Sequence, residues 1–293
     1  MEEKIFNGDF FKKLNSINFN VRTRLSGGAQ GGRRSRAKGS SVEFSDFREY
    51  VPGDDFRRID WNAYGRFDRL FVKLFMEEKE ANFNIFIDSS KSMDFGQDKK
   101  SHMALKIAAA LSYIILNNLD RVYISSLKDG NLETSRGASG KMLFQRLLKD
   151  LSSINFEGGT DLAASIMKRK ITCRGVSIII SDFFDAKAIE EALKYLAYKK
   201  QEIILVNIFS KEELHPEFEG VVNLIDSETG EELRVSLTPS ILKEYKLRLD
   251  NFCNNLEALA FKYGAPYIKV SSEEPLEKVI LKNFTSKGLV YKE

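Results

Sequence analysis

Hydroxyl and carboxylate side chains occur at three points in the chain, in a pattern that could bind a hard metal ion. Asp88, Ser90 and Ser92 form a D-x-S-x-S sequence, in which one turn can direct three side chains to a single point. Thr160 follows two glycines, and Asp182 follows an apolar β-branched run. Oxygen donors of this kind suit Mg2+ or Mn2+, which prefer octahedral oxygen shells. Because the set has few carboxylates, the ion would keep water and an open coordination position.

The segments that must position these residues alternate between strand and helix patterns. Strands are predicted at 82–88, 121–126, 176–181, 202–208 and 266–270, helices at 100–118, 140–152, 160–170, 187–199, 240–263 and 275–284, and a hairpin at 221–235. This alternation predicts an α/β fold with βαβ units on a mostly parallel sheet. Ligands of such sheets bind beyond the carboxyl ends of the strands, where Asp88 and Asp182 fall.

Each piece of the pattern also has an ordinary structural explanation. Serine-rich loops after strands are common, and Asp-Ser-Ser alone would be a helix cap. What favours a metal site is the presence of all three pieces, in order and at strand ends.

Together these residues resemble the metal-ion-dependent adhesion site of von Willebrand factor A domains, through D-x-S-x-S at 88–92, Gly-Gly-Thr-Asp at 158–161 and Ser-Asp at 181–182. The resemblance covers roughly residues 81–285 and implies a Rossmann-like sheet with helices on both faces. It implies that Ser90, Ser92 and Thr160 coordinate the ion directly, and that Asp88 and Asp182 do so directly or through water. An acidic side chain of a protein partner would then complete the metal shell.

Ahead of the predicted domain at 81–293, the chain divides into two zones. Residues 1–41 combine an amphipathic helix, with Ile5, Phe6, Phe10 and Leu14 at helical spacing, and a Gly/Ser/Arg stretch that predicts a flexible loop. Residues 42–80 predict a small β-rich segment. Within it, 70–77 has the pattern of a strand, and 59–67 is a candidate for its hairpin partner.

The 42–80 zone is dense in turn-forming and charged residues. Pro52-Gly-Asp-Asp55 predicts a turn by composition, and surface ion pairs are the plain structural explanation of the charges. With Lys73 and Glu77, however, the stretch resembles the core pattern of the family known as domain of unknown function 58. The matching residues are Arg48, Tyr50, Gly53, Asp54, Asp55, Arg57, Asp60, Trp61 and Arg66. Gly65 departs from the pattern, in which Ala or Ser usually precedes the arginine.

This second resemblance also implies a partner. Members of the family carry the same block ahead of a von Willebrand-type domain, and are thought to act with MoxR-type AAA+ ATPases in assembling, maturing or remodelling other proteins. The sequence itself does not show what the block does. We hypothesise that Arg57, Asp60, Trp61 and Arg66 fix a small β-structure against the larger domain.

Enzymatic chemistry finds little support in the sequence. The two histidines, His102 and His215, have no serine or cysteine nucleophile at a recognisable spacing. The Gly-rich stretches 27–32 and 135–141 lack the Gly-Lys-Ser/Thr ending of a phosphate loop. Metal-assisted hydrolysis stays open as an alternative, because an open magnesium site can activate water. We therefore expect a non-catalytic, metal-dependent adaptor for protein binding.

Charge and composition set further bounds. A formal net charge of +3 is too small to indicate a nucleic-acid or membrane partner. The basic 22–38 segment is the one feature that favours nucleic acid, but no aromatic residues interleave with it to stack on bases. Two cysteines give no disulfide framework, and neither a long apolar run nor a signal peptide is found, so the expected compartment is the cytoplasm.

Overall fold

The computed structural model describes residues 10, 13–20, 42–77, 80–184, 186–216, 220–227 and 230–292, with the backbone alone at 42–46, 74–77 and 186–188. Two compact units are present. The α/β unit comprises Met1–Thr23 and Ala81–Glu293, and the signature unit comprises Arg24–Glu80. The predicted Gly/Ser/Arg loop and the basic 22–38 segment lie outside the described residues.

A seven-stranded sheet forms the centre of the α/β unit, in the order β12-β9-β8-β4-β5-β6 with β7 paired to β5. The parallel strands are β4 (Asn82–Asp88), β5 (Arg121–Lys128), β8 (Gly175–Ser181), β9 (Gln201–Phe209) and β12 (Tyr267–Ser271). Two short strands, β6 (Asn131–Thr134) and β7 (Ala138–Ser139), run antiparallel to β5.

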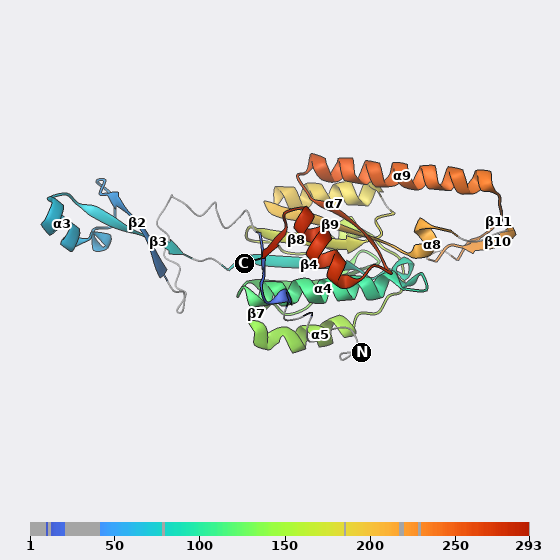
Figure 1. The fold of residues 1–293 in the computed structure, drawn as a ribbon, viewed down its shortest axis with the longest axis horizontal. Helices are drawn as coiled ribbons and strands as arrows, with labels where there is room; N and C mark the ends of the chain where they lie inside the picture. The colour runs from blue at the N-terminus through green and yellow to red at the C-terminus, as the bar shows by residue number, and fades with distance from the viewer. Residues whose placement is uncertain are drawn as a thin grey trace. The chain divides into compact units, whose positions relative to one another are not determined.

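Helices cover both faces of this sheet (Figure 1). On one face lie α4 (Lys100–Asn117), α5 (Phe144–Ser152), α10 (Leu276–Lys278) and the π-helix η5 (Val279–Phe284), and on the other lie α6 (Leu162–Met167), α7 (Ala186–Tyr198) and α9 (Pro239–Lys262). Side chains alternate between the two cores, with Ile85 and Ile87 on the α4 side and Phe86 on the α7 side, as the period of a strand requires. The predicted fold class is confirmed.

The N-terminal residues belong to this same core. Strand β1 (Ile17–Phe19) pairs with the C-terminal strand β13 (Val290–Lys292), and the Phe19 and Phe83 rings lie 5.0 Å apart, edge to face. Phe10 and Leu14 are helical and buried, in agreement with the predicted amphipathic pattern, whereas Ile5 and Phe6 lie outside the described residues. The pairing of β1 with β13 was not predicted.

Between β9 and α9 the chain forms a helical turn, α8 (Lys211–Leu214), and a hairpin of β10 (Gly220–Ile225) and β11 (Glu232–Leu237). Two 3-10 turns complete the unit, η3 (Lys91–Asp94) after β4 and η4 (Lys141–Leu143) before α5. Among the residues that the structure describes, no helix combines the length and apolar character needed to cross a bilayer.

The signature unit is a hairpin of β2 (Val42–Glu49) and β3 (Phe71–Glu77), joined through the 3-10 turn η2 (Phe56–Arg58) and helix α3 (Trp61–Phe67). The prediction that 59–67 pairs with the following strand is wrong for most of its length, since β2 is the partner and only Ile59 bridges to Val72. The reason is local: the Asp60 carboxylate caps α3 by accepting from the backbone N–H groups of Asn62 and Ala63.

Candidate metal centre

Three of the predicted metal-binding segments meet at the carboxyl edge of the sheet. Asp88 is the last residue of β4, and Asp182 directly follows β8, the parallel neighbour of β4. Because the strands are in register, their carboxyl ends lie side by side, and Asp182 is close enough for its charge to affect the pKa of Asp88.

The Asp88 carboxylate is buried and held by two internal donors. The Ser181 hydroxyl donates to its Oδ2 over 2.6 Å, and the Ser90 backbone N–H donates to its Oδ1 over 3.0 Å. Burial first, and then the charge of Asp182, raise the pKa of Asp88 above its ordinary value. The charged form of Asp88 is therefore disfavoured in the protein alone, and a bound cation would favour it.

Hydroxyl groups supply the rest of the donor set. Ser90 and Ser92 place their Oγ atoms 2.9 Å apart. Thr160 has a buried Oγ1 atom that meets no hydrogen-bond partner among the described residues. A buried hydroxyl without a protein partner is usually satisfied by ordered water or by an ion.

The loop that carries Thr160 is tied to the serine loop through the backbone. Lys91 donates its N–H to the Gly158 carbonyl over 2.9 Å, and Glu157 donates to the Ser89 carbonyl over 3.0 Å. No hydrogen bond joins the Thr160 side chain to Ser90 or Ser92 in the part of the chain that the structure describes. The structure therefore brings the two loops together and leaves the Thr160 hydroxyl available.

Asp129, which sequence reasoning missed, fixes this loop from the end of β5. Its Oδ1 accepts from the Gly159 N–H over 2.8 Å, and its own N–H donates to the Gly159 carbonyl over 3.0 Å. Gly158 has a φ of +74°, and a Cβ atom there would lie 2.5 Å from Asp129 Oδ2. Gly158 is thus favoured both by its backbone conformation and by the lack of space for a side chain. The Asp129-Gly130 pair gives a turn signal, but it does not show this contact.

Lys100 is the most unexpected member of the site. It begins α4 with only 1% of its surface exposed, and its ammonium lies 2.8 Å from Asp182 Oδ2 and 2.7 Å from Glu213 Oε1. Burial alone would lower the pKa of Lys100, but the two carboxylates outweigh it and raise that pKa above its ordinary value. The lysine is therefore a fixed positive charge bound to a predicted metal ligand.

Glu213 is held in turn by a capping box at the end of β9. Its Oε2 accepts from the Ser210 N–H over 2.7 Å, while the Ser210 hydroxyl accepts from the Glu213 N–H over 3.1 Å. Ser210-Lys-Glu-Glu213 after an apolar run is a capping signal that could have been read from the sequence, although its link to Lys100 could not.

Aromatic side chains surround the lysine. Its Nζ atom lies 5.3 Å from the Phe184 ring centroid and 6.0 Å from that of Phe95. Both rings are about half exposed, at 53% and 46% respectively, and Phe184 stacks on Phe252. Two half-exposed aromatic rings thus lie beside the lysine that contacts the candidate metal centre.

These residues fit a hard divalent cation of the magnesium or manganese type. The described part of the chain contains no cluster of three or more His, Cys, Asp or Glu side chains suited to a metal. The candidate centre is of another kind, with three hydroxyls and two carboxylates. Its unpartnered Thr160 oxygen and raised Asp88 pKa are what a site built around a cation would show.

The residues of the second signature gather in the signature unit, where several stabilise its turns. Asp54 accepts from the Val51 N–H and pairs with Arg48 over 2.8 Å, and these two contacts, in that order of size, lower the pKa of Asp54. The Asp55 carboxylate accepts from the Arg57 N–H, and Asp60 pairs with Lys73. Two further members are Tyr50, whose N–H donates to the Leu70 carbonyl, and Gly53, with a φ of +108°.

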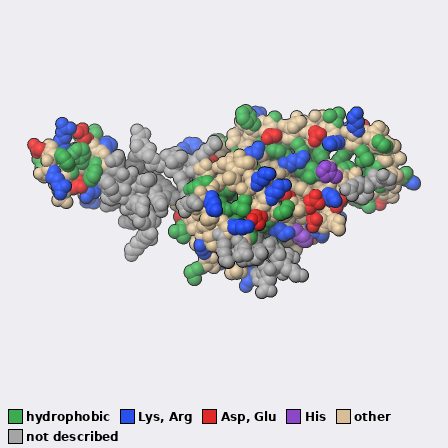
Figure 2. Space-filling view, viewed as in Figure 1, with side chains coloured by type: hydrophobic (Ala, Val, Ile, Leu, Met, Phe, Trp, Pro, Cys, Tyr) green, Lys and Arg blue, Asp and Glu red, His purple; other side chains and the backbone are tan. Residues whose placement is uncertain are grey.

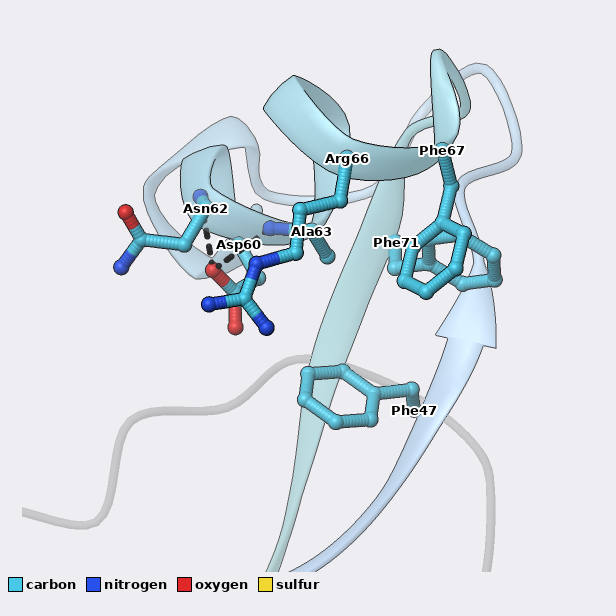
Figure 3. Close-up of a pocket in the computed structure, with 7 residues that line it drawn as sticks. All are labelled: Phe47, Asp60, Asn62, Ala63, Arg66, Phe67 and Phe71. Atoms are coloured by element: carbon cyan, nitrogen blue, oxygen red, sulfur yellow. Dashed lines mark hydrogen bonds between the residues drawn. The ribbon is translucent and has the colours of Figure 1, made fainter.

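Trp61 and Arg66, the last two signature residues, make contacts of other kinds. Trp61 is 62% exposed and makes one edge-to-face contact with Tyr64. Arg66 lines a hollow of about 270 Å³ within this unit. Figure 3 shows the rings of Phe47, Phe67 and Phe71 on one side of the hollow and the polar residues Asp60, Asn62 and Arg66 on the other.

Comparison with known proteins identifies the family. Residues 46–250, more than half of the chain, match the protein family described as "Protein of unknown function DUF58", and the chain belongs to this family. It is 23% identical over 239 residues to the uncharacterized proteins Rv1480 of Mycobacterium tuberculosis and Mb1516 of Mycobacterium bovis. That alignment covers 79% of this chain and 75% of each relative.

Solved structures similar to this chain include one hypothetical protein and one VWA domain. The hypothetical protein BatB of Bacteroides thetaiotaomicron is 16% identical, with a TM-score of 0.44 and coverage of 71% of this chain and 98% of that protein. The SpRpn10 VWA domain is 12% identical, with a TM-score of 0.39 and coverage of 69% and 94%.

Proposed function

We propose that this chain is a non-catalytic adaptor that binds Mg2+ or Mn2+ and, through the ion, a carboxylate of a protein partner. The ligands would be Asp88, Ser90, Ser92, Thr160 and Asp182. The observation that carries the proposal is the buried Thr160 hydroxyl, which has no partner among the described residues and lies on a loop bonded to that of the serines.

The surroundings of the centre support docking. A bound ion would supply a positive charge with an open position for an acidic side chain. Ser181 and the Ser90 N–H hold Asp88 in place, so that the ligand set is organised in advance. Phe95 and Phe184 would exclude water around the bound carboxylate and strengthen its attraction to the ion. We therefore expect the partner segment to carry apolar residues beside its acidic residue.

Catalysis is less well supported than docking. Both histidines are exposed, and neither has a recorded side-chain contact with the centre in the described residues. The buried lysine is committed to two carboxylates, so it does not serve as a general base. On the face shown in Figure 2, Lys and Arg side chains of the α/β unit are interspersed with Asp and Glu side chains, rather than gathered into a basic patch for nucleic acid.

A MoxR-type AAA+ ATPase is part of the proposal as the energy source for remodelling the bound partner. The ATPase partner is proposed from the likeness of the signature residues to the family pattern. An external energy source is needed because the Gly-rich stretches of the chain do not form a phosphate loop.

Affinity capture from native cells tests the adaptor function. Full-length wild type and a Ser90→Ala, Ser92→Ala variant are compared, each with Mg2+ or with a chelator. The double variant and the chelator should each remove the same partner, and Mn2+ binding measured by calorimetry should be lost in parallel. Partners retained under both treatments would contradict metal-bridged binding.

Ser89→Ala is the matched control. Ser89 is in the same loop and is buried as Ser90 is, but its hydroxyl donates to the Leu127 carbonyl over 2.8 Å and is not a proposed ligand. This variant should keep Mn2+ binding and the partner. If it loses both, the effect of the double variant reflects the order of the loop instead of metal coordination.

A further inference from the structure

Lys100 breaks two ordinary rules of protein structure. A cation at the first position of a helix opposes the helix dipole, and a lysine with 1% exposure gives up its hydration. Local rules are broken most often where function requires it. The contacts of the Lys100 ammonium indicate which function its burial serves.

The ammonium is anchored from two sides. Asp182 lies 2.8 Å away and Glu213 2.7 Å away, and Glu213 is itself fixed by the Ser210 capping box. The turn of Glu213 is locked against the start of α4 as well, since Gln97 donates its N–H to Glu212 and a Cβ atom on Gly96 would lie 2.8 Å from Ser210 Cβ. The position of Lys100 is therefore set by the fold and does not depend on an ion.

Oxygens of both Asp88 and Asp182 are already engaged in contacts within the protein. Both oxygens of Asp88 accept internal hydrogen bonds, from Ser181 and from the Ser90 N–H. Asp182 Oδ2 accepts a hydrogen bond from the Lys100 ammonium. A cation that approached Asp182 through both oxygens would meet the ammonium charge at Oδ2.

We propose that Lys100 is a positioning residue that determines which metal the site accepts: by holding Asp182 Oδ2, it prevents bidentate coordination and selects Mg2+ and Mn2+ against Ca2+. This inference rests on the proposed metal-binding function. Ca2+ takes six to eight oxygens and readily uses bidentate carboxylates, whereas Mg2+ needs an octahedral shell and keeps several waters. A site in which Lys100 holds one oxygen of Asp182 and both oxygens of Asp88 accept hydrogen bonds within the protein suits Mg2+ better than Ca2+.

The test is a set of Mn2+, Mg2+ and Ca2+ titrations by calorimetry on the full-length chain. Two variants release Asp182: Lys100→Met, and the double variant Lys100→Met, Glu213→Gln. The double variant keeps the net charge of the chain and leaves no unpaired Glu213, so it retains the fold even if the single variant does not. Lys99→Met is the matched control, because this neighbouring lysine is exposed and pairs with Asp94 instead.

We expect the wild type to bind Mn2+ more tightly than Ca2+, and the double variant to lower the ratio of the two affinities roughly tenfold, within the range seen when an outer partner of a metal ligand is removed. Lys99→Met should keep the wild-type ratio. Glu213→Gln alone should also keep it, because a glutamine oxygen still accepts from Lys100, while its lost charge weakens all three ions alike.

The inference is overturned if the double variant keeps the wild-type ratio of affinities. It is also overturned if the wild type binds Ca2+ as tightly as Mn2+, a result that does not depend on how the variants fold. Failure of the proposed function gives a different result. In that case the wild type binds none of the three ions, or Ser90→Ala, Ser92→Ala binds them as the wild type does.

Discussion

At the scale of single residues, Gly158 sets the position of the loop that carries Thr160. Its φ of +74° is one that other residues rarely adopt, and Asp129 Oδ2 occupies the space a side chain would need. We predict that Gly158→Ala lowers the free energy of unfolding by more than about 1 kcal/mol and weakens Mn2+ binding, because the loop must shift to clear Asp129. Urea denaturation and calorimetry measure the two effects.

Gly264→Ala separates the effect of backbone strain from the effect of the clash with Asp129. Gly264 has a similar φ of +64°, but open space surrounds the added Cβ atom. This control should lose stability through backbone strain alone, about 1 kcal/mol, and keep its Mn2+ affinity. An unchanged affinity in Gly158→Ala would show that the loop does not position a metal ligand.

The residues of the candidate metal centre differ in how far their positions could be predicted from the sequence. Asp88, Ser90 and Ser92 lie within one turn, so their spacing already places them together, and Asp182 follows from the rule for strand ends. Lys100 could not be found in this way. Its partners Asp182 and Glu213 are 82 and 113 residues away in the chain, and nothing in the sequence states which lysine a fold will bury between them.

At the scale of elements, α3 shows how a cap can override a strand-like pattern. Residues 59–67 are rich in aromatic side chains, which favour strands, but Asp60 provides an acceptor for the first free N–H groups of a helix. The long buried strands were predictable because both faces of the sheet need apolar residues. Short elements such as β1, β7 and β13 were not, since two or three residues carry no usable periodicity.

We predict that Asp60→Ala loosens α3 selectively. Loss of the cap should speed amide hydrogen exchange within 61–67 roughly fivefold, while exchange in the α/β unit stays the same. Asp60→Asn is the control, because asparagine also caps helices but cannot form the ion pair with Lys73. Equal acceleration in both variants would assign the effect to the ion pair and not to the cap.

At the scale of the whole molecule, the chain places one unit inside the sequence of another. The α/β unit is interrupted between Thr23 and Ala81, and the signature unit fills the interval. Phe19 and Phe83, described residues on either side of the interruption, lie close together, with their ring centroids 5.0 Å apart. Domains are commonly inserted at sites of this kind, where the ends of the host chain are near each other.

This arrangement predicts that the α/β unit folds without the signature unit. Replacing residues 24–80 by a short Gly/Ser linker should give a protein that unfolds cooperatively and binds Mn2+ as the full chain does, because the core and the metal centre lie wholly in the residues that remain. A chain that starts at Ala81 is the control. It also loses Leu14, Ile17 and Phe19, each buried and contributing roughly 1.5–3 kcal/mol, so it should be far less stable than the linked protein. If the linked protein is as unstable as this control, the signature unit contributes to the stability of the α/β unit and the two do not fold independently.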